Sequence, residues 1–139
     1  MPIPIFVTHH LVKGEDLNHH GTLYAGRSAE WFVESGFIAA AGITRPENIV
    51  CLKIHGMTFT RPVKRGEVIR MESRVIFTGK SRMVSFIQMK GREPDDLIVQ
   101  GFITFVHVDQ EGKPLPHGIV IIPDTPEESD LQELARALN

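Results

Sequence analysis

The sequence predicts a single α+β domain in which a curved antiparallel sheet wraps one long central helix, with a short helix near the C-terminus. Its 139 residues, 42% hydrophobic and 23% charged, have the size and composition of one globular domain over 1–139. The segment from about 24 to 41 carries too many apolar residues for a helix that buries only one side. Four strand-like runs follow it, and this order places the helix against a sheet.

Each expected element has a local signal. Residues 3–12 are rich in β-branched and aromatic side chains, which favours a first strand ending at Lys13. Gly42 is placed to cap the C-terminal end of the long helix. Residues 125–128, T-P-E-E, form a capping box with proline at the first helical position, which predicts the short helix. The later strands are expected to form an antiparallel meander over 49–60, 67–78, 81–91 and 97–109.

Composition excludes several classes of function. A formal net charge of -2 argues against a general nucleic-acid binder. No stretch is long and apolar enough to span a bilayer, and the N-terminus lacks the basic segment of a secretory signal. We therefore expect a cytoplasmic protein that binds neither nucleic acid nor membrane. The single cysteine, Cys51, lies in the alternating run V-C-L-K-I-H and is expected to be a buried strand thiol without chemistry.

The most informative segment is the junction between a polar loop and the long helix, D-L-N-H-H-G-T-L-Y-A-G at 16–26. The N–H groups in the first turn of a helix have no internal partner, and glycines let a carbonyl or phosphate approach them. Gly21 and Gly26 are placed for such an approach. The alternative interpretation is an ordinary loop before a buried helix.

The string N-H-H-G-T-L-Y-A-G, followed by Trp31, resembles the acyl-CoA thioesterases of the hotdog superfamily, which typically show N-H-x-G-T-L-F-G-G before A-W-M-D-E. Three further segments are similar to family motifs: M-T-F-T-R-P-V-K-R-G-E-V at 57–68, T-G-K-S-R-M at 78–83 and F-V-H-V-D-Q-E-G-K-P-L-P at 105–116. The resemblance implies the hotdog fold and hydrolysis of an acyl-CoA to a free acid and CoA. It also implies a homodimer as the minimum unit, with tetramers or hexamers common.

The resemblance assigns roles at the junction. Thioester hydrolysis needs an activated water and a donor for the carbonyl oxygen, but no metal, because a thiolate leaves readily. The implied donors are the backbone N–H groups near Ala25 and Gly26, and the implied loop residue is Asn18. In the family the base is usually an acidic residue on the central helix, contributed across the dimer interface.

The sequence departs from the family at this base, because Val33 stands where the family carries Asp. Three interpretations remain open. Glu34 supplies the carboxylate through a small rotation of the helix. Alternatively, Asn18 orients the water while His20 or Asp16 takes the proton. In the third, the site binds acyl-CoA without turning it over quickly.

Ordinary structural roles compete with these assignments. Glu34 lies at helical spacing from Arg27 and Glu30, which is typical of a solvated polar stripe. Asn18 belongs to a residue type that often bonds its own backbone in turns. The adjacent histidine pairs lack the ligand spacing of a zinc site, so no metal is expected.

The phosphates of CoA require Lys or Arg side chains near the surface. Arg61, beside one turn, is a candidate ligand, as are Lys80 and Ser81 in a hairpin that matches a family motif near the CoA-binding region. CoA is part of the substrate, and no separate cofactor is expected. One alternative function is an acyl-thioester hydratase or dehydratase, which would want a histidine on the helix or a loop Asp-His pair in place of Asn18 and Glu34. The other is a non-catalytic acyl-CoA-binding or sensor protein, which the valine at 33 favours.

Overall fold

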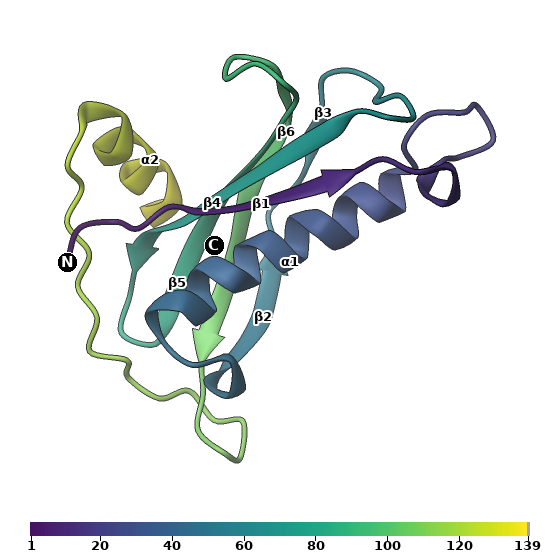
Figure 1. The fold of residues 1–139 in the computed structure, drawn as a ribbon. Coiled ribbons are helices and arrows are strands. Elements are labelled where there is room, and N and C mark those ends of the chain that lie inside the picture. The colour runs from purple at the N-terminus through teal and green to yellow at the C-terminus, as the bar shows by residue number, and fades with distance from the viewer. Residues whose placement is uncertain (139) are drawn as a thin grey trace.

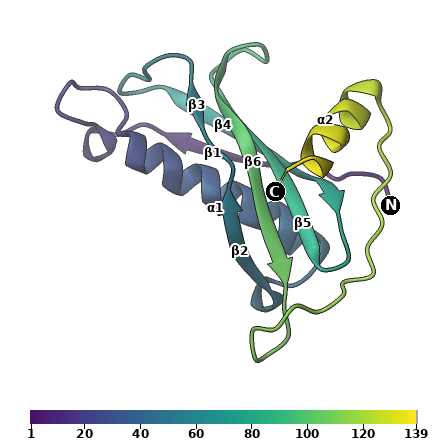
Figure 2. The same cartoon turned by 180° about the vertical axis from the view of Figure 1, so that it is seen from behind.

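A computed structural model describes residues 1–138. One antiparallel sheet carries the long helix α1 (Ala25–Ile43) on one face and the short helix α2 (Pro126–Arg136) on the other (Figures 1 and 2). The strands are β1 (Phe6–Leu11), β2 (Ile49–Ile54), β3 (Thr58–Phe59), β4 (Val68–Thr78), β5 (Arg82–Lys90) and β6 (Leu97–His107). The α+β architecture expected from the sequence is confirmed. Within residues 1–138, no helix has the length and apolar character needed to cross a membrane.

The strand order is β1-β4-β5-β6-β2, and β3 also pairs with β6. Strands β4, β5 and β6 are three of the four strands of the expected meander. The single strand expected at 49–60 is instead two strands, and both lie beside β6 at the far edge of the sheet. The break falls near Gly56, which has a φ of 121°, a left-handed value that favours glycine. Its carbonyl oxygen passes so close to Gly101 of β6 that a Cβ there would overlap it.

Small residues let α1 lie close to the sheet. Gly36 is buried, and a Cβ there would come within 3.0 Å of Ile87 and 3.3 Å of Ile103. Two buried serines of the sheet fasten the helix: the Ser73 hydroxyl donates to the Ser35 carbonyl at 2.6 Å, and the Ser85 hydroxyl donates to the Gly36 carbonyl at 2.9 Å. These contacts fix both the distance and the rotation of α1.

The expected cap at Gly42 is wrong, because the helix continues to Ile43. Thr44 ends it instead, with its N–H bonded to the Ala41 carbonyl at 3.3 Å and its hydroxyl to the Ala40 carbonyl at 2.6 Å. The Phe6 ring occupies the space that a side chain at Gly42 would need. This glycine therefore serves packing rather than termination.

The capping box of α2 forms in part. Thr125 accepts a hydrogen bond from the Glu128 N–H at 3.1 Å, as expected, but the Glu128 carboxylate accepts from the Asp124 N–H at 2.8 Å. The same carboxylate lies 3.6 Å from Arg74 of β4. The helix therefore packs by a polar contact as well as by apolar contacts with Ile76, Phe77, Val84 and Phe86.

Strand β2 forms one edge of the sheet, and all of its residues after Ile49 are exposed. Cys51 is exposed as well, so the expectation of a buried thiol is wrong. The expectation assumed that the alternating run is covered on one face, whereas every residue of this edge strand after Ile49 is open. The unpaired edge exposes backbone N–H and C=O groups that can pair with another chain.

Candidate active site

Asn18 organises the loop before α1. Its Oδ1 accepts from the N–H groups of His20 at 2.9 Å and Thr22 at 3.1 Å, and its Nδ2 donates to the Thr22 hydroxyl at 3.1 Å. The side-chain oxygen of Asn18 therefore has the turn-stabilising role expected of an asparagine, because it binds backbone N–H groups of its own loop. A side-chain amide carries two N–H bonds, so one remains for a ligand.

The buried residue Asp16 ties this loop to the helix. Its carboxylate accepts from the Lys13 N–H at 2.9 Å and lies 3.4 Å from Nε of Arg27, while its carbonyl accepts from the Tyr24 N–H at 2.8 Å. Only 3% of Asp16 is exposed. Its carboxylate is thus engaged in holding the loop in place.

The start of α1 has two open backbone donors. The N–H groups of Arg27 and Ser28 both donate to the Tyr24 carbonyl, at 3.0 and 3.1 Å. Those of Ala25 and Gly26 have no partner among residues 1–138. The positive end of the helix dipole lies at the same place and favours negative charge. The expected oxyanion donors are therefore open.

A cavity of about 370 Å³ opens beside these groups, and Asn18, Ala25 and Ser28 all line it. The structure thus brings the expected loop residue and the expected helix start to one site. The other walls come from the loop end, β3 and its neighbours: Leu23, Phe59, Thr60, Arg61, Pro62, Val63 and Ile98. Most of these walls are apolar, which strengthens the electrostatic effect of the few polar groups.

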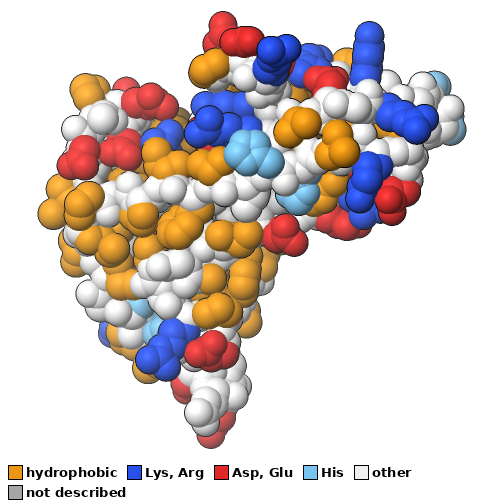
Figure 3. Space-filling view, viewed as in Figure 1, with side chains coloured by type: hydrophobic (Ala, Val, Ile, Leu, Met, Phe, Trp, Pro, Cys, Tyr) orange, Lys and Arg blue, Asp and Glu red, His pale blue; other side chains and the backbone are white. Residues whose placement is uncertain are grey.

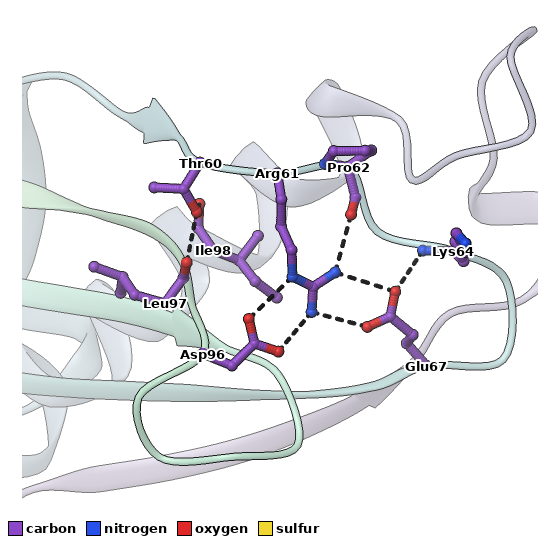
Figure 4. A network of polar contacts seen from close by, with 8 residues as sticks. All are labelled: Thr60, Arg61, Pro62, Lys64, Glu67, Asp96, Leu97 and Ile98. Atoms are coloured by element: carbon purple, nitrogen blue, oxygen red, sulfur yellow. Dashed lines mark hydrogen bonds and ion pairs between the residues drawn. The ribbon is translucent and has the colours of Figure 1, made fainter.

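Arg61 lies at the edge of this cavity at the centre of an ion-pair network (Figure 4). It bonds Asp96 from Nε at 3.0 Å and from Nη2 at 2.7 Å. It bonds Glu67 from Nη2 at 2.9 Å and from Nη1 at 3.3 Å, and Nη1 also donates to the Pro62 carbonyl at 2.9 Å. Guanidinium has five N–H bonds, and all five are used here.

Arg61 is therefore placed as a clamp between the turn before β4 and the turn before β6. The arrangement leaves no N–H of Arg61 for a CoA phosphate, which argues against the expected role of this residue as a CoA ligand. The shared hydrogen bonds raise the pKa of Arg61 and lower the pKa values of Glu67 and Asp96.

Val33 and Glu34 lie on a different surface of α1. A largely apolar groove of about 570 Å³ runs between the helix and β2, lined by Val33, Glu34, Phe37, Cys51 and Phe105, together with Gly26, Ala29 and Glu30. Glu34 is exposed at the rim of this groove. Successive helical residues point about 100° apart, so the side chains of Val33 and Glu34 diverge.

Glu34 is remote from the open N–H groups of its own subunit. It follows Ala25 by nine residues, which is about 13 Å along a helix axis. The Glu34 carboxylate interacts electrostatically with His10 of β1. Burial lowers the pKa of His10, and the negative charges of Glu34 and Asp16 partly oppose this shift. Within one subunit, Glu34 cannot reach a carbonyl held at the helix start.

The other candidate residues are dispersed. His20 gives its backbone N–H to Asn18, while its exposed ring lies 3.9 Å from the ring of His19. Lys80 and Ser81 lie in the β4–β5 turn, at the opposite end of the sheet from the Asn18 loop (Figure 1). One subunit alone does not bring them to the cavity. In the part of the chain that the structure describes, no cluster of three or more His, Cys, Asp or Glu could hold a metal.

Two polar residues of the site did not emerge from the sequence. Thr22 holds the Asn18 amide, and its place inside the loop motif is a signal that could have found it. Ser28 lines the cavity from the first turn of α1. No pattern distinguishes it from other helical serines, because its role depends on the rotation of the helix.

Comparison with known proteins identifies the class. The model of the thioesterase superfamily matches residues 20–98. Over 126 residues the chain is 31% identical to the uncharacterised acyl-CoA thioester hydrolase YkhA of Bacillus subtilis, covering 86% of this chain and 71% of YkhA. The chain therefore belongs to the thioesterase superfamily. Its sheet wrapped around a helix is the hotdog fold.

Solved structures agree with this assignment. An acyl-CoA hydrolase from Staphylococcus aureus, in complex with butyryl coenzyme A, coenzyme A and coenzyme A disulfide, is similar with a TM-score of 0.82 and 25% identity, over 95% of this chain and 79% of that one. A hexameric thioesterase from Yersinia pestis is similar with a TM-score of 0.71 and 28% identity, over 78% of this chain and 91% of that one.

The Arg61 clamp predicts a specific loss of stability in acid. The lowered pKa values of Glu67 and Asp96 mean that their contribution is present above the unfolded carboxyl pKa, about 4, and is lost as pH falls through the lower folded values. We expect Arg61→Gln to lower the melting temperature at neutral pH and to flatten its fall between about pH 5 and 2. Thermal unfolding measured across this range tests it.

Arg70→Gln is the matched control, since Arg70 pairs with Glu72 at 2.8 Å but its side chain is 48% exposed. It should keep the acid dependence of the wild type, because exposed pairs contribute little. Identical pH profiles for Arg61→Gln and the wild type would show that the clamp does not stabilise the fold.

Proposed function

We propose that this protein hydrolyses acyl-CoA thioesters in the cavity at the N-terminus of α1, in a site completed by a second subunit. The observation that carries the proposal is the pair of unpartnered N–H groups at Ala25 and Gly26, with Ala25 lining the same cavity as Asn18. The family and the acyl-CoA hydrolases among its relatives support the activity and CoA as the thiol of the substrate.

The cavity can stabilise the charge that develops during hydrolysis. As water attacks the carbonyl carbon, the carbonyl oxygen gains negative charge and accepts hydrogen bonds from the N–H groups of Ala25 and Gly26. The free N–H of Asn18 holds the thioester in place from the loop side. The C–S bond then breaks, CoA leaves as a thiolate, and the proton of the water passes to a base.

We assign that base to Glu34 of the partner subunit. In its own subunit Glu34 is about 13 Å along the helix from the open N–H groups, but a helix packed in the opposite direction would place it near the partner's helix start. The loop carboxylate of Asp16 is held by Lys13 and Arg27, which makes it the weaker candidate. His20 is the remaining alternative from the loop.

The surface beside α1 fits a second copy of this chain. Strand β2 leaves its edge unpaired, and the groove along Val33 and Phe37 is largely apolar. In the space-filling view, hydrophobic side chains gather over the C-terminal half of α1, while many charged groups gather toward the other end (Figure 3). Pairing of two β2 edges would continue the sheet and bury both grooves. The hexameric relative supports assembly beyond the dimer.

CoA recognition then falls to residues outside the Arg61 clamp. Lys80 and Ser81 lie about one strand length from the Asn18 loop of their own subunit, which is roughly 35 Å for eleven residues. We propose that they contact CoA bound mainly to a neighbouring subunit. A single subunit therefore lacks two parts of the proposed site: the Glu34 carboxylate of its partner, and the Lys80 and Ser81 contacts to CoA from a neighbouring subunit.

The first prediction concerns turnover and the Asn18 donor. Acyl-CoAs from acetyl to long-chain should release free CoA, measured with a thiol reagent. Asn18→Asp keeps an oxygen acceptor for the N–H groups of His20 and Thr22, so the loop should keep its turn, but it removes the free N–H donor. We expect kcat to fall roughly 10²-fold.

Circular dichroism and melting temperature should match the wild type if the turn survives. An unchanged kcat in a folded Asn18→Asp enzyme would reduce Asn18 to a turn residue. A wild-type protein that binds acyl-CoAs across the panel without releasing CoA would favour the acyl-CoA-binding or sensor function instead.

The second prediction tests the partner's base. Glu34→Gln should abolish most turnover while leaving the fold intact, because an exposed charge contributes little to stability. Co-expressing Asn18→Asp and Glu34→Gln subunits with different tags should restore activity in purified mixed oligomers. One site of each mixed dimer then combines an intact Asn18 with an intact Glu34.

Mixed oligomers as inactive as both parents would place the base in the same subunit as Asn18. Full activity of Glu34→Gln would instead move the base to the loop, to Asp16 or His20. Co-expressing two differently tagged Glu34→Gln subunits is the control, since it provides no intact carboxylate.

A further inference from the structure

Ser28 differs from the buried serines of the sheet. Ser73 and Ser85 are buried and donate to carbonyls of α1. Ser28 is only 2% exposed, yet its hydroxyl makes no hydrogen bond with any residue of 1–138. What surface it keeps faces the cavity that Asn18 and Ala25 also line.

The Ser28 hydroxyl keeps a small accessible surface, since His10 Nε2 is the one fully buried polar side-chain atom without a partner in residues 1–138. Its hydrogen bond has to come from water or a ligand, because the protein supplies none. Such groups persist where something else supplies the partner. In this cavity the available partner is the molecule that occupies it.

Helix geometry directs this hydroxyl toward the reacting group. Ala25 and Ser28 are three residues apart and so share one face of α1. Side chains on a helix lean toward its N-terminus, which brings the Ser28 hydroxyl back toward the open N–H of Ala25. The Ser28 hydroxyl and the Ala25 N–H therefore converge on the same part of the cavity.

We propose that the Ser28 hydroxyl donates a hydrogen bond to the thioester carbonyl oxygen, as a third donor beside the N–H groups of Ala25 and Gly26. This assignment rests on the proposed hydrolysis. Ser28 keeps its proton and forms no bond to the acyl group, because no histidine or carboxylate hydrogen-bonds to it within residues 1–138, as a nucleophilic serine would require.

The test is Ser28→Ala, measured in the intact oligomer with an acyl-CoA that the wild type hydrolyses. A donor used mainly in the transition state should lower kcat roughly 10²-fold and leave KM nearly unchanged. The melting temperature should stay the same or rise, because the substitution removes no protein hydrogen bond.

Ser35→Ala is the matched control. Ser35 lies on the same buried side of α1, is 3% exposed and has a hydroxyl without a partner in residues 1–138, but it does not line this cavity. Its substitution should leave kcat unchanged. The two variants thus separate a donor in the cavity from a general effect of serine on helix packing.

Three results would overturn the assignment: an unchanged kcat in Ser28→Ala, an equal loss in both variants, or a clear fall in the melting temperature of Ser28→Ala, which would reveal an internal hydrogen bond. Failure of the proposed function is distinguishable, because the wild type itself would then release no CoA from any acyl-CoA.

Discussion

The close packing of α1 against the sheet is the constraint on which the rest of the molecule depends. Gly36 lets the helix approach Ile87 and Ile103, and two sheet serines bond carbonyls of its middle turns. A helix fixed in distance and rotation presents the same first turn to the same place. Ala25 consequently lines a defined cavity together with Asn18, and Gly26 follows it in the same helical turn.

The electrostatics of the site follow from this placement. Arg61, the cation at the wall of the cavity, gives all of its N–H bonds to Asp96, Glu67 and Pro62. Its charge is therefore balanced by these neighbouring groups and not by a ligand. In the proposed mechanism, the attraction for a developing oxyanion therefore comes from the helix start and from neutral donors. Such an arrangement needs no free cation beside the reacting carbonyl.

Sequence patterns predicted the parts of the fold that depend on local signals. The helix, the last three strands of the expected four-stranded meander and the cap at Thr125 follow from periodicity and from turn and capping residues. The division of the segment around Gly56 does not, because it depends on the close approach to Gly101 across the sheet. The exposure of Cys51 likewise depends on which strand becomes the edge.

The same division holds for the site. The loop motif identified Asn18 and the helix start because those residues are neighbours in sequence. Arg61 has no N–H free for CoA because it pairs with groups such as Asp96, which lies 35 residues away in the sequence. Ser28 lines the cavity because of the rotation of the helix. Neither property could be predicted from a motif. The position of Glu34 relative to the cavity depends on a second subunit, which a single sequence specifies only through its open edge and apolar groove.

The most direct measurement is a crystal structure of the protein with an acyl-CoA analogue in which a methylene replaces the thioester sulfur. The proposed mechanism predicts that the analogue's carbonyl oxygen lies within about 3 Å of the N–H groups of Ala25 and Gly26, with Asn18 beside it. The partner subunit's Glu34 should approach the opposite side of the carbonyl. A carbonyl bound away from the start of α1, or an acyl group enclosed by a single subunit, would contradict it.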